Sequence, residues 1–279
     1  MDLRLKSVLQ HAIMAPSGDN CQPWKFSVKP LQIDLYNLKQ RASLIAHGAL
    51  LENIRITAPT VGLHSTFELF PDPDNSHHIA SINFAECATE ASSSQFLAIA
   101  ERQTNREKYI PVTISDSQIK SWQDLAERDG EKIWLSCQKK QIADLSRLLS
   151  LNDRLVFEVP ELHRFLFEQI RWSDSDAVTT GDGLDIKTLG LNAIDKVAFR
   201  FLKHHGLVVA LKKVGFSRII QTWLGCRAEE GRFFKDYTDE GRTITQDSIS
   251  HCHYDYTKCV IAGLCIWRTT VATVVIAAC

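Results

Sequence analysis

The segment Ala15–Trp24, with the sequence APSGDNCQPW, constrains this chain more than any other stretch. Apolar residues at helical spacing precede it, and the run Trp24–Val28 that follows has strand character, so the segment joins a helix end to a strand start. Pro16 and Pro23 fix φ near its two ends and remove two backbone donors. Gly18 permits the backbone to approach a ligand closely. The segment therefore predicts a constrained loop rather than a flexible linker.

The side chains of this loop are polar. Its hydrogen-bonding members are Ser17, Asp19, Asn20 and Gln22. The amides of Asn20 and Gln22 each offer one acceptor and two donors, which suits the edge of a flat heterocycle with alternating donors and acceptors. A capped turn that binds nothing is the alternative interpretation, because these residue types are also the ordinary turn formers.

A second polar cluster follows about eighty residues later, in the run ERQTNR at 101–106, with Tyr109 just beyond it. If this run is helical, Arg102 and Arg106 lie four residues apart and share one face. Two guanidinium groups and the Thr104 hydroxyl would form a phosphate site. A solvated basic face that pairs with neighbouring glutamates is the alternative.

Both clusters resemble segments of the nitroreductase-like flavoprotein family. The order A-P-S-x-x-N-x-Q-P-W resembles the loop along the isoalloxazine ring of FMN, and E-R-x-T-N-R-x-x-Y resembles the arginine-rich phosphate segment of that family. The resemblance covers roughly residues 1–225. It implies an α+β fold, with a mainly antiparallel sheet flanked by helices. The FMN-binding residues that it implies are Pro16, Ser17, Asn20, Gln22, Arg102, Thr104 and Arg106.

The resemblance also implies a reaction. NAD(P)H would be a transient electron donor, and a small nitro, quinone or related compound would be the acceptor. Flavin N5 would carry the chemistry, so no catalytic side chain is expected. The sequence has no G-x-G-x-x-G or Walker loop, so the donor would bind over the flavin without a Rossmann domain. A flavin-sequestering protein without turnover, and a degenerate structural protein without flavin, stay open as alternatives.

Composition excludes some partners. The formal net charge is −1 over 279 residues, which argues against broad nucleic-acid or acidic-lipid binding because both need a positive field. The eight cysteines form no CxxC pair and no signal peptide opens the sequence, so a reduced cytoplasmic protein is expected. The apolar run 260–279 holds Arg268 near its middle, which favours buried core or an irregular tail over a membrane span.

Other chemistries find less support. His251, Cys252 and His253, with Cys259 and Cys265 downstream, are zinc ligand types, but they lack the usual CxxC or HxxxH spacing. We therefore expect no metal. No G-x-S-x-G elbow is present for a serine hydrolase.

Local patterns predict the elements. A hairpin over 24–28 and 31–36 turns at Lys29-Pro30, and strands are expected over 65–70, 78–84 and 132–137. Helices are expected over 48–62, 96–102, 115–128 from a capping box, 141–157, from Pro160, and within 192–224. A glycine-rich loop is expected over 179–190.

The domain organisation is expected to follow the family over residues 1–244 and to depart from it over 245–279, as an atypical or truncated C-terminus. A faint repeat of helix, turn, strand and helix suits the longer family members, which resemble two fused halves. The chain would then be either a homodimer or an internally duplicated monomer.

Overall fold

The computed structural model describes residues 1–38, 44–89, 93–102, 104, 115–128, 140, 151 and 154–213. The described residues fall into two compact units, one within 1–104 and 115–128 and the other within 154–213. The predicted boundary at residue 244, the strand over 132–137 and the second copy of the faint repeat lie largely outside the described residues. Those interpretations remain predictions.

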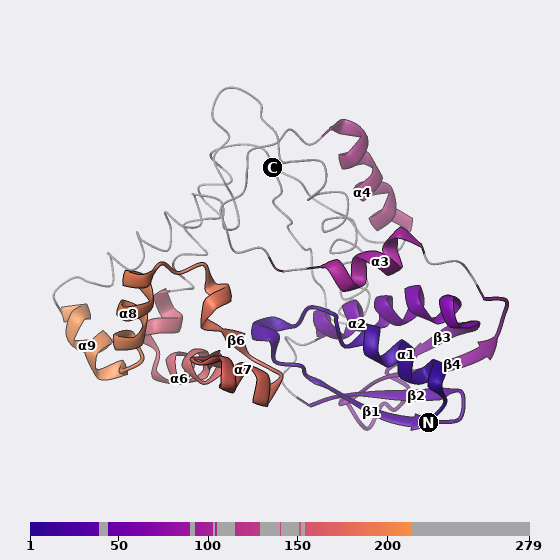
Figure 1. Cartoon of the computed structure of the whole chain (residues 1–279), viewed down its shortest axis with the longest axis horizontal. Coiled ribbons are helices and arrows are strands. Elements are labelled where there is room, and N and C mark those ends of the chain that lie inside the picture. The colour runs from indigo at the N-terminus through magenta and orange to yellow at the C-terminus, as the bar shows by residue number, and fades with distance from the viewer. Residues whose placement is uncertain are drawn as a thin grey trace. The chain divides into compact units, whose positions relative to one another are not determined.

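The first unit is α+β, with an antiparallel sheet flanked by helices (Figure 1). Its helices are α1 (Leu3–Ala12), α2 (Leu44–Thr57), α3 (Ser94–Glu101) and α4 (Asp116–Arg128). Short 3-10 turns, η1 (Gly18–Asn20) and η3 (Ala58–Val61), join them to the strands. This arrangement confirms the α+β class predicted from the sequence.

Local signals explain the helix ends. Asp2 caps α1 by accepting a hydrogen bond from the Arg4 backbone N–H at 2.8 Å. The capping box predicted before α4 is present, because the Ser115 N–H donates to Gln118 Oε1 at 3.0 Å and the Gln118 N–H donates to Ser115 Oγ at 3.3 Å. The helix predicted over 48–62 begins earlier, at Leu44, and gives way to η3 at the turn containing Pro59.

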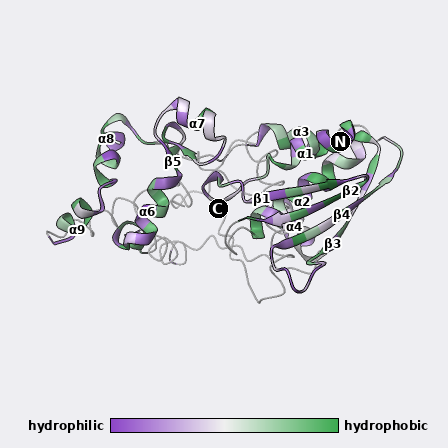
Figure 2. Ribbon diagram, turned by 90° about the horizontal axis from the view of Figure 1, so that it is seen from below, coloured by the Kyte–Doolittle hydropathy of each residue, from purple (hydrophilic) through white to green (hydrophobic). Residues whose placement is uncertain are grey.

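The sheet has the order β1-β2-β4-β3, and every neighbouring pair is antiparallel (Figure 2). The strands are β1 (Trp24–Lys29), β2 (Gln32–Asn37), β3 (Leu63–Leu69) and β4 (His78–Glu86). The predicted hairpin is confirmed, with its turn one residue later than expected, since Lys29 pairs with Gln32 and the turn consists of Pro30 and Leu31. A bulge between Leu35 and Tyr36 shifts the pairing of β2 with β4.

The core of the first unit lies between the sheet and the helices. Leu5, Val8 and Ala12 bury one stripe of α1. The helix α2 is buried on nearly all sides, which makes it the central helix of the unit. From the sheet, Ile33, Leu35, Ala80 and Ile82 are each fully buried. Trp24 is the last residue of the loop Ala15–Trp24, which we call the motif loop. It belongs to this core and is 8% exposed.

The second unit is mainly helical, with α6 (Pro160–Gln169), α7 (Asp174–Thr180), α8 (Ala193–Leu202) and α9 (His205–Lys213). The strands β5 (Ile170–Arg171) and β6 (Leu184–Asp185) form a short parallel pair, followed by η4 (Ile186–Leu189). Pro160 occupies the first turn of α6, as predicted. An aromatic core joins the helices around Phe157, Phe167 and Phe199.

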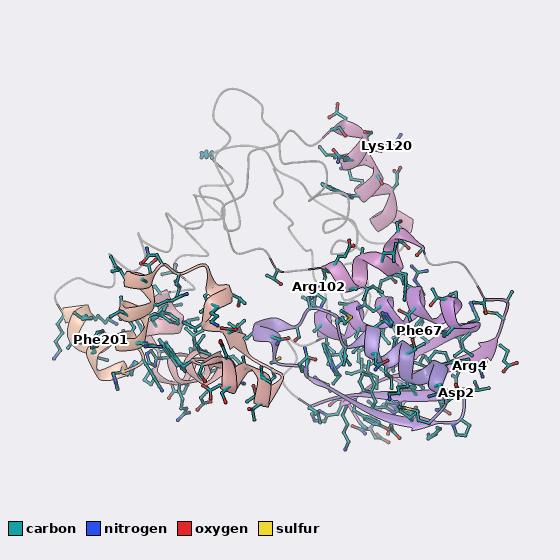
Figure 3. The ribbon with its side chains drawn as sticks, viewed as in Figure 1. Asp2, Arg4, Phe67, Arg102, Lys120 and Phe201 are labelled. Carbon is teal, nitrogen blue, oxygen red and sulfur yellow. The ribbon has the colours of Figure 1, made fainter. Side chains whose placement is uncertain are left out.

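The continuous helical pattern expected within 192–224 is broken. α8 ends at Leu202 and α9 starts at His205, and residues beyond 213 lie outside the described part of the chain. The apolar residues that give α8 its helical periodicity include Ile194, Val197 and Phe201, which are 81%, 55% and 60% exposed, whereas Phe199 is buried. Figure 3 labels Phe201. The helix therefore packs through Phe199 and in part through Leu202, and of these two the periodicity singled out only Leu202.

Candidate functional site

The motif loop is strained in the structure. Asp19, Asn20 and Gln22 have φ values of 50°, 51° and 45°, in the left-handed region that non-glycine residues seldom adopt. Across the described residues, only Leu31 and Phe70 are further non-glycine cases. Such strain costs energy and tends to cluster where a backbone is shaped for a ligand. Asp and Asn adopt this region in ordinary turns, so Gln22 is the residue whose conformation a simple turn does not explain.

Gly18 does not occupy the left-handed region; the strain lies on the residues after it. A Cβ added at Gly18 would meet no heavy atom within 4 Å. The glycine therefore leaves open space beside the loop, which agrees with the close approach expected there but does not arise from an unusual φ.

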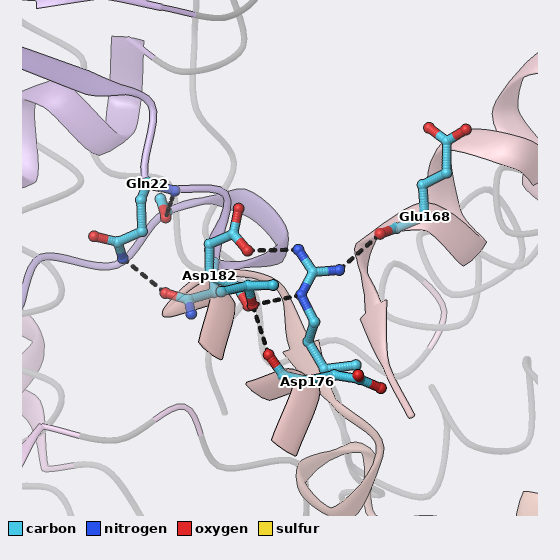
Figure 4. Close-up of polar contacts among 8 residues, drawn as sticks. Gln22, Glu168, Asp176 and Asp182 are labelled. Carbon is cyan, nitrogen blue, oxygen red and sulfur yellow. Dashed lines mark hydrogen bonds and ion pairs between the residues drawn. The ribbon is translucent and has the colours of Figure 1, made fainter. Parts of the chain in front are cut away.

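Hydrogen bonds within the loop hold its polar side chains together (Figure 4). The Gln22 backbone N–H donates to Ser17 Oγ at 3.2 Å, and Gln22 Nε2 donates to Asn20 Oδ1 at 2.8 Å. Ser17 and Gln22 are half-buried and Asn20 is exposed. Three of the predicted binding residues therefore form one local network, while Ala15, Pro23 and Trp24 are buried at its ends.

Arg102 reaches back to the start of this loop. Its Nη2 donates to the backbone carbonyl of Met14 at 3.1 Å, across 88 residues of sequence. Met14 directly precedes the Ala15–Trp24 loop, so the structure brings Arg102 to the beginning of the first motif. Figure 3 labels Arg102 at the end of α3.

The condition under which Arg102 and Arg106 would share one helix face is not met at Arg102. α3 ends at Glu101, and Arg102 itself has φ −59° and ψ 124°, which is not helical. The Arg102 side chain therefore does not lie on the face of α3. Thr104 is exposed two residues further on, and Arg106 and Tyr109 lie outside the described residues.

One contributing residue was missed by the sequence analysis. Asn53, buried within α2, donates from Nδ2 to the backbone carbonyl of His11 at 3.1 Å. The His11 ring contacts Phe96 of α3 with centroids 4.8 Å apart. The end of α1 is therefore fixed from two helices before the loop begins. An asparagine inside an apolar helical run was the available signal, because a buried amide requires a partner.

The chemistry of these groups fits a flavin nucleotide. Arg102 Nε is buried and has no hydrogen-bond partner in the described part of the structure. A buried guanidinium N–H without an acceptor is costly, and a phosphate oxygen is the acceptor that it binds best. The side-chain carbonyl of Gln22 also accepts no hydrogen bond from a described residue, so it can meet a donor on a polar ring edge.

The described residues contain no group of three or more His, Cys, Asp or Glu side chains that could hold a metal ion. The histidines and cysteines around His251 lie outside them. Within the same ranges, no helix combines the length and apolar character needed to cross a membrane.

Comparison with known proteins gives distant relatives. The chain is 32% identical over 114 residues to "Putative NAD(P)H nitroreductase acg" of Mycobacterium tuberculosis, which covers 37% of this chain and 34% of that protein. It is 24% identical over 180 residues to "Putative NAD(P)H nitroreductase Rv3131" of the same organism, covering 61% of this chain and 51% of that protein. These similarities support a nitroreductase-like family.

A further relative carries no functional name. The "Uncharacterized protein MT1398" of M. tuberculosis is 24% identical over 213 residues, covering 73% of this chain and 30% of that protein. The matches thus span about a third to a half of the length of these relatives. No family model matches the chain.

Proposed function

We propose that this chain is an FMN-dependent oxidoreductase of nitroreductase type, which passes electrons from NAD(P)H to a small nitro, quinone or related acceptor. The observation that carries the proposal is the buried Nε of Arg102, which has no hydrogen-bond partner among the described residues. The bond to the Met14 carbonyl holds it beside the start of a strained polar loop. The names of the distant relatives favour the same chemistry.

The chain's own groups would hold and orient the cofactor. Arg102 would bind the phosphate, with Thr104 and Arg106 as the further phosphate ligands. Pro16, Ser17, Asn20 and Gln22 would line the ring, with the Gln22 side-chain carbonyl available to a ring donor. The bound FMN would supply the hydride-accepting centre, and the protein would supply binding and orientation.

The cofactor test compares FMN with riboflavin, which lacks the phosphate. Apo-protein should bind FMN more tightly, and Arg102→Ala should weaken FMN binding by roughly tenfold or more, because a charge-assisted hydrogen bond contributes about 1.5–3 kcal/mol. Riboflavin affinity should fall less than FMN affinity, because riboflavin lacks the phosphate. Arg4→Ala is the matched control, since Arg4 pairs with Asp2 and Glu86 and is not part of the loop. Equal affinities for the two flavins would remove the phosphate role.

The turnover test separates the enzyme from the alternatives. With FMN bound, NAD(P)H should bleach the flavin absorbance, and a nitroaromatic or a quinone should restore it. A bound flavin that neither nicotinamide reduces would favour a sequestering protein, and a chain that binds no flavin would favour a structural one. Size measurement in the same preparation would decide between a homodimer and a monomer. From the cysteine pattern we propose a cytoplasmic location.

A further inference from the structure

The second unit contains an open groove of about 470 Å³ that the proposed oxidoreductase function does not use. Its lining includes His163, Arg164, Phe167, Trp172, Lys203 and His205. A volume of this size lies within the range of small-molecule sites in proteins. All of these residues belong to the described range 154–213.

The groove has an aromatic wall. Phe167 and Trp172 have nearly parallel rings, with centroids 6.2 Å apart and an interplanar angle of 2°. Phe167 belongs to the core of the unit, so it is held by packing, while Trp172 is half-buried and keeps part of its ring accessible. A flat apolar ligand would find a rigid surface of matching shape here.

A cation lies directly over this wall. Lys203 Nζ is 5.7 Å from the centroid of the Trp172 ring, a cation–π geometry that holds the ammonium beside the aromatic surface. Neither Lys203 nor Arg164 makes an ion pair within the described residues, whereas Arg171, Lys187 and Lys212 of the same unit each pair with a carboxylate. The groove thus has two cations that make no ion pair within the described residues.

The remaining polar wall is formed by two histidines. His163 Nε2 lies 2.7 Å from the Leu202 carbonyl and His205 Nε2 lies 3.1 Å from the Glu158 carbonyl. Since a carbonyl only accepts, both nitrogens are donors. Burial lowers the pKa of His163, and the neighbouring His205 adds to this, against a smaller opposing effect of the Leu202 carbonyl. The His163 side chain, which lines the groove, is therefore neutral at pH 7.

One acidic group opposes the two cations. Glu168 also lines the groove and makes no ion pair within the described residues. Two cations against one carboxylate leave the lining with an excess of positive charge, which favours an anion of single charge over a neutral ligand.

From this juxtaposition of an aromatic wall with these two cations, we propose that the groove binds a small aromatic carboxylate. The ring of the ligand contacts Trp172 and Phe167, and its carboxylate contacts Lys203 and Arg164. The flavin has no part in this site, so the site stands if the flavin proposal fails.

The test uses 2-naphthoate as the probe and its neutral analogue 2-naphthamide as the control ligand. Isothermal titration of the full chain is done with excess FMN present, so that a flavin site is not available to the probe. We expect 2-naphthoate to bind and 2-naphthamide to bind at least about threefold more weakly, which is the scale of a solvent-exposed charge interaction. Equal binding of the two compounds, or no binding of the carboxylate, would overturn the proposal.

Two variants should change the affinity for 2-naphthoate in opposite directions. Lys203→Met should weaken 2-naphthoate binding about three- to fivefold, while Glu168→Gln should strengthen it about two- to threefold, because one removes attraction and the other removes repulsion. Lys213→Met is the matched control, since Lys213 is exposed on α9 and does not line the groove. Circular dichroism melting verifies that each variant folds. Equal effects of Lys203→Met and Lys213→Met would show that the net charge of the protein, rather than a contact with Lys203, controls binding, and would overturn the proposal.

Discussion

Arg102 Nη2 donates to the backbone carbonyl of Met14 at 3.1 Å, which connects the end of α3 to the end of α1. The same guanidinium keeps its Nε buried and without a partner among the described residues. One edge of the group therefore serves the protein, and the other is left for a ligand. This division of roles depends on the planar fork of arginine, which presents donors in fixed directions.

Arg102→Lys should therefore separate charge from geometry. A lysine ammonium is a point charge on a flexible stem, so it cannot donate to Met14 and to a phosphate in the same fixed arrangement. We expect FMN binding about five- to tenfold weaker than in the wild type, yet stronger than in Arg102→Ala. Fluorescence titration with FMN measures both. Full retention of affinity in Arg102→Lys would show that charge alone is sufficient.

Asn53→Ala should destabilise the first unit by about 0.5–1.5 kcal/mol, because the His11 carbonyl loses its side-chain donor and keeps only the Met14 backbone N–H at 3.2 Å. Since Asn53 also fixes the end of α1, the loop after it should lose order, and FMN affinity should fall with stability. Urea unfolding and FMN titration measure the two effects. Asn53→Asp is the matched variant, of nearly the same size but without the amide donor. If FMN affinity stays unchanged in both variants, Asn53 does not position the loop.

The loop should separate stability from binding. Trp24 is 8% exposed and its ring meets His47 edge-on at 6.3 Å, so Trp24→Ala should cost about 3–5 kcal/mol. Asn20 is exposed, so Asn20→Ala should change stability little while lowering FMN affinity. Chemical unfolding and flavin titration of both variants check this. Equal stability losses would make the loop purely structural.

The sequence predicted this loop well because its signals are local. Prolines at the ends, an apolar helix before it and alternating strands after it depend on neighbours only. Its strain was not predicted, because the residue types of the loop do not show that Asp19, Asn20 and Gln22 take left-handed φ values while Gly18 does not.

The contacts that complete the site could not be predicted, because they are nonlocal. No pattern within the run 101–106 shows that Arg102 leaves the helix and reaches Met14. Likewise, helical periodicity marks Ile194 and Phe201 as apolar positions of α8, but only packing decides that Phe199 is the residue that the core buries.

In the second unit, Gly183 should not tolerate a side chain. Its φ is +80°, and an added Cβ would lie 2.5 Å from Arg171 Cζ and 2.6 Å from the Gln169 carbonyl oxygen. Arg171 is itself held by Thr180, Asp182 and the Glu168 carbonyl (Figure 4). Gly183→Ala should therefore cost roughly 1–3 kcal/mol through strain and overpacking. Gly206→Ala, where a Cβ would meet nothing within 4 Å, is the control. Thermal melting of both variants compares them, and equal melting temperatures would contradict the prediction.

Acid should weaken the first unit through Asp34, a buried carboxylate on β2. Burial by itself would raise the pKa of Asp34, but hydrogen bonds from Lys29, Ser81 and Gln32 outweigh it, so the pKa lies below the ordinary value of 3.8. Lys29 Nζ lies 2.8 Å from one carboxylate oxygen, and Ser81 Oγ donates to the other at 2.8 Å. Because the folded pKa is the lower one, the stabilisation is fully present above about pH 4 and is lost as the pH falls through the folded pKa.

Asp34→Asn should therefore be less stable than the wild type at pH 7, by about 1–3 kcal/mol, because the charged partner of Lys29 is lost. Its stability should also fall less between pH 5 and pH 2.5 than that of the wild type, since the titrating group is gone. Urea unfolding across this pH range measures both slopes. Asp124→Asn, at an exposed position on α4, is the matched control and should follow the wild type. An Asp34→Asn variant that loses stability as steeply as the wild type would show that other carboxylates control the acid sensitivity of this unit.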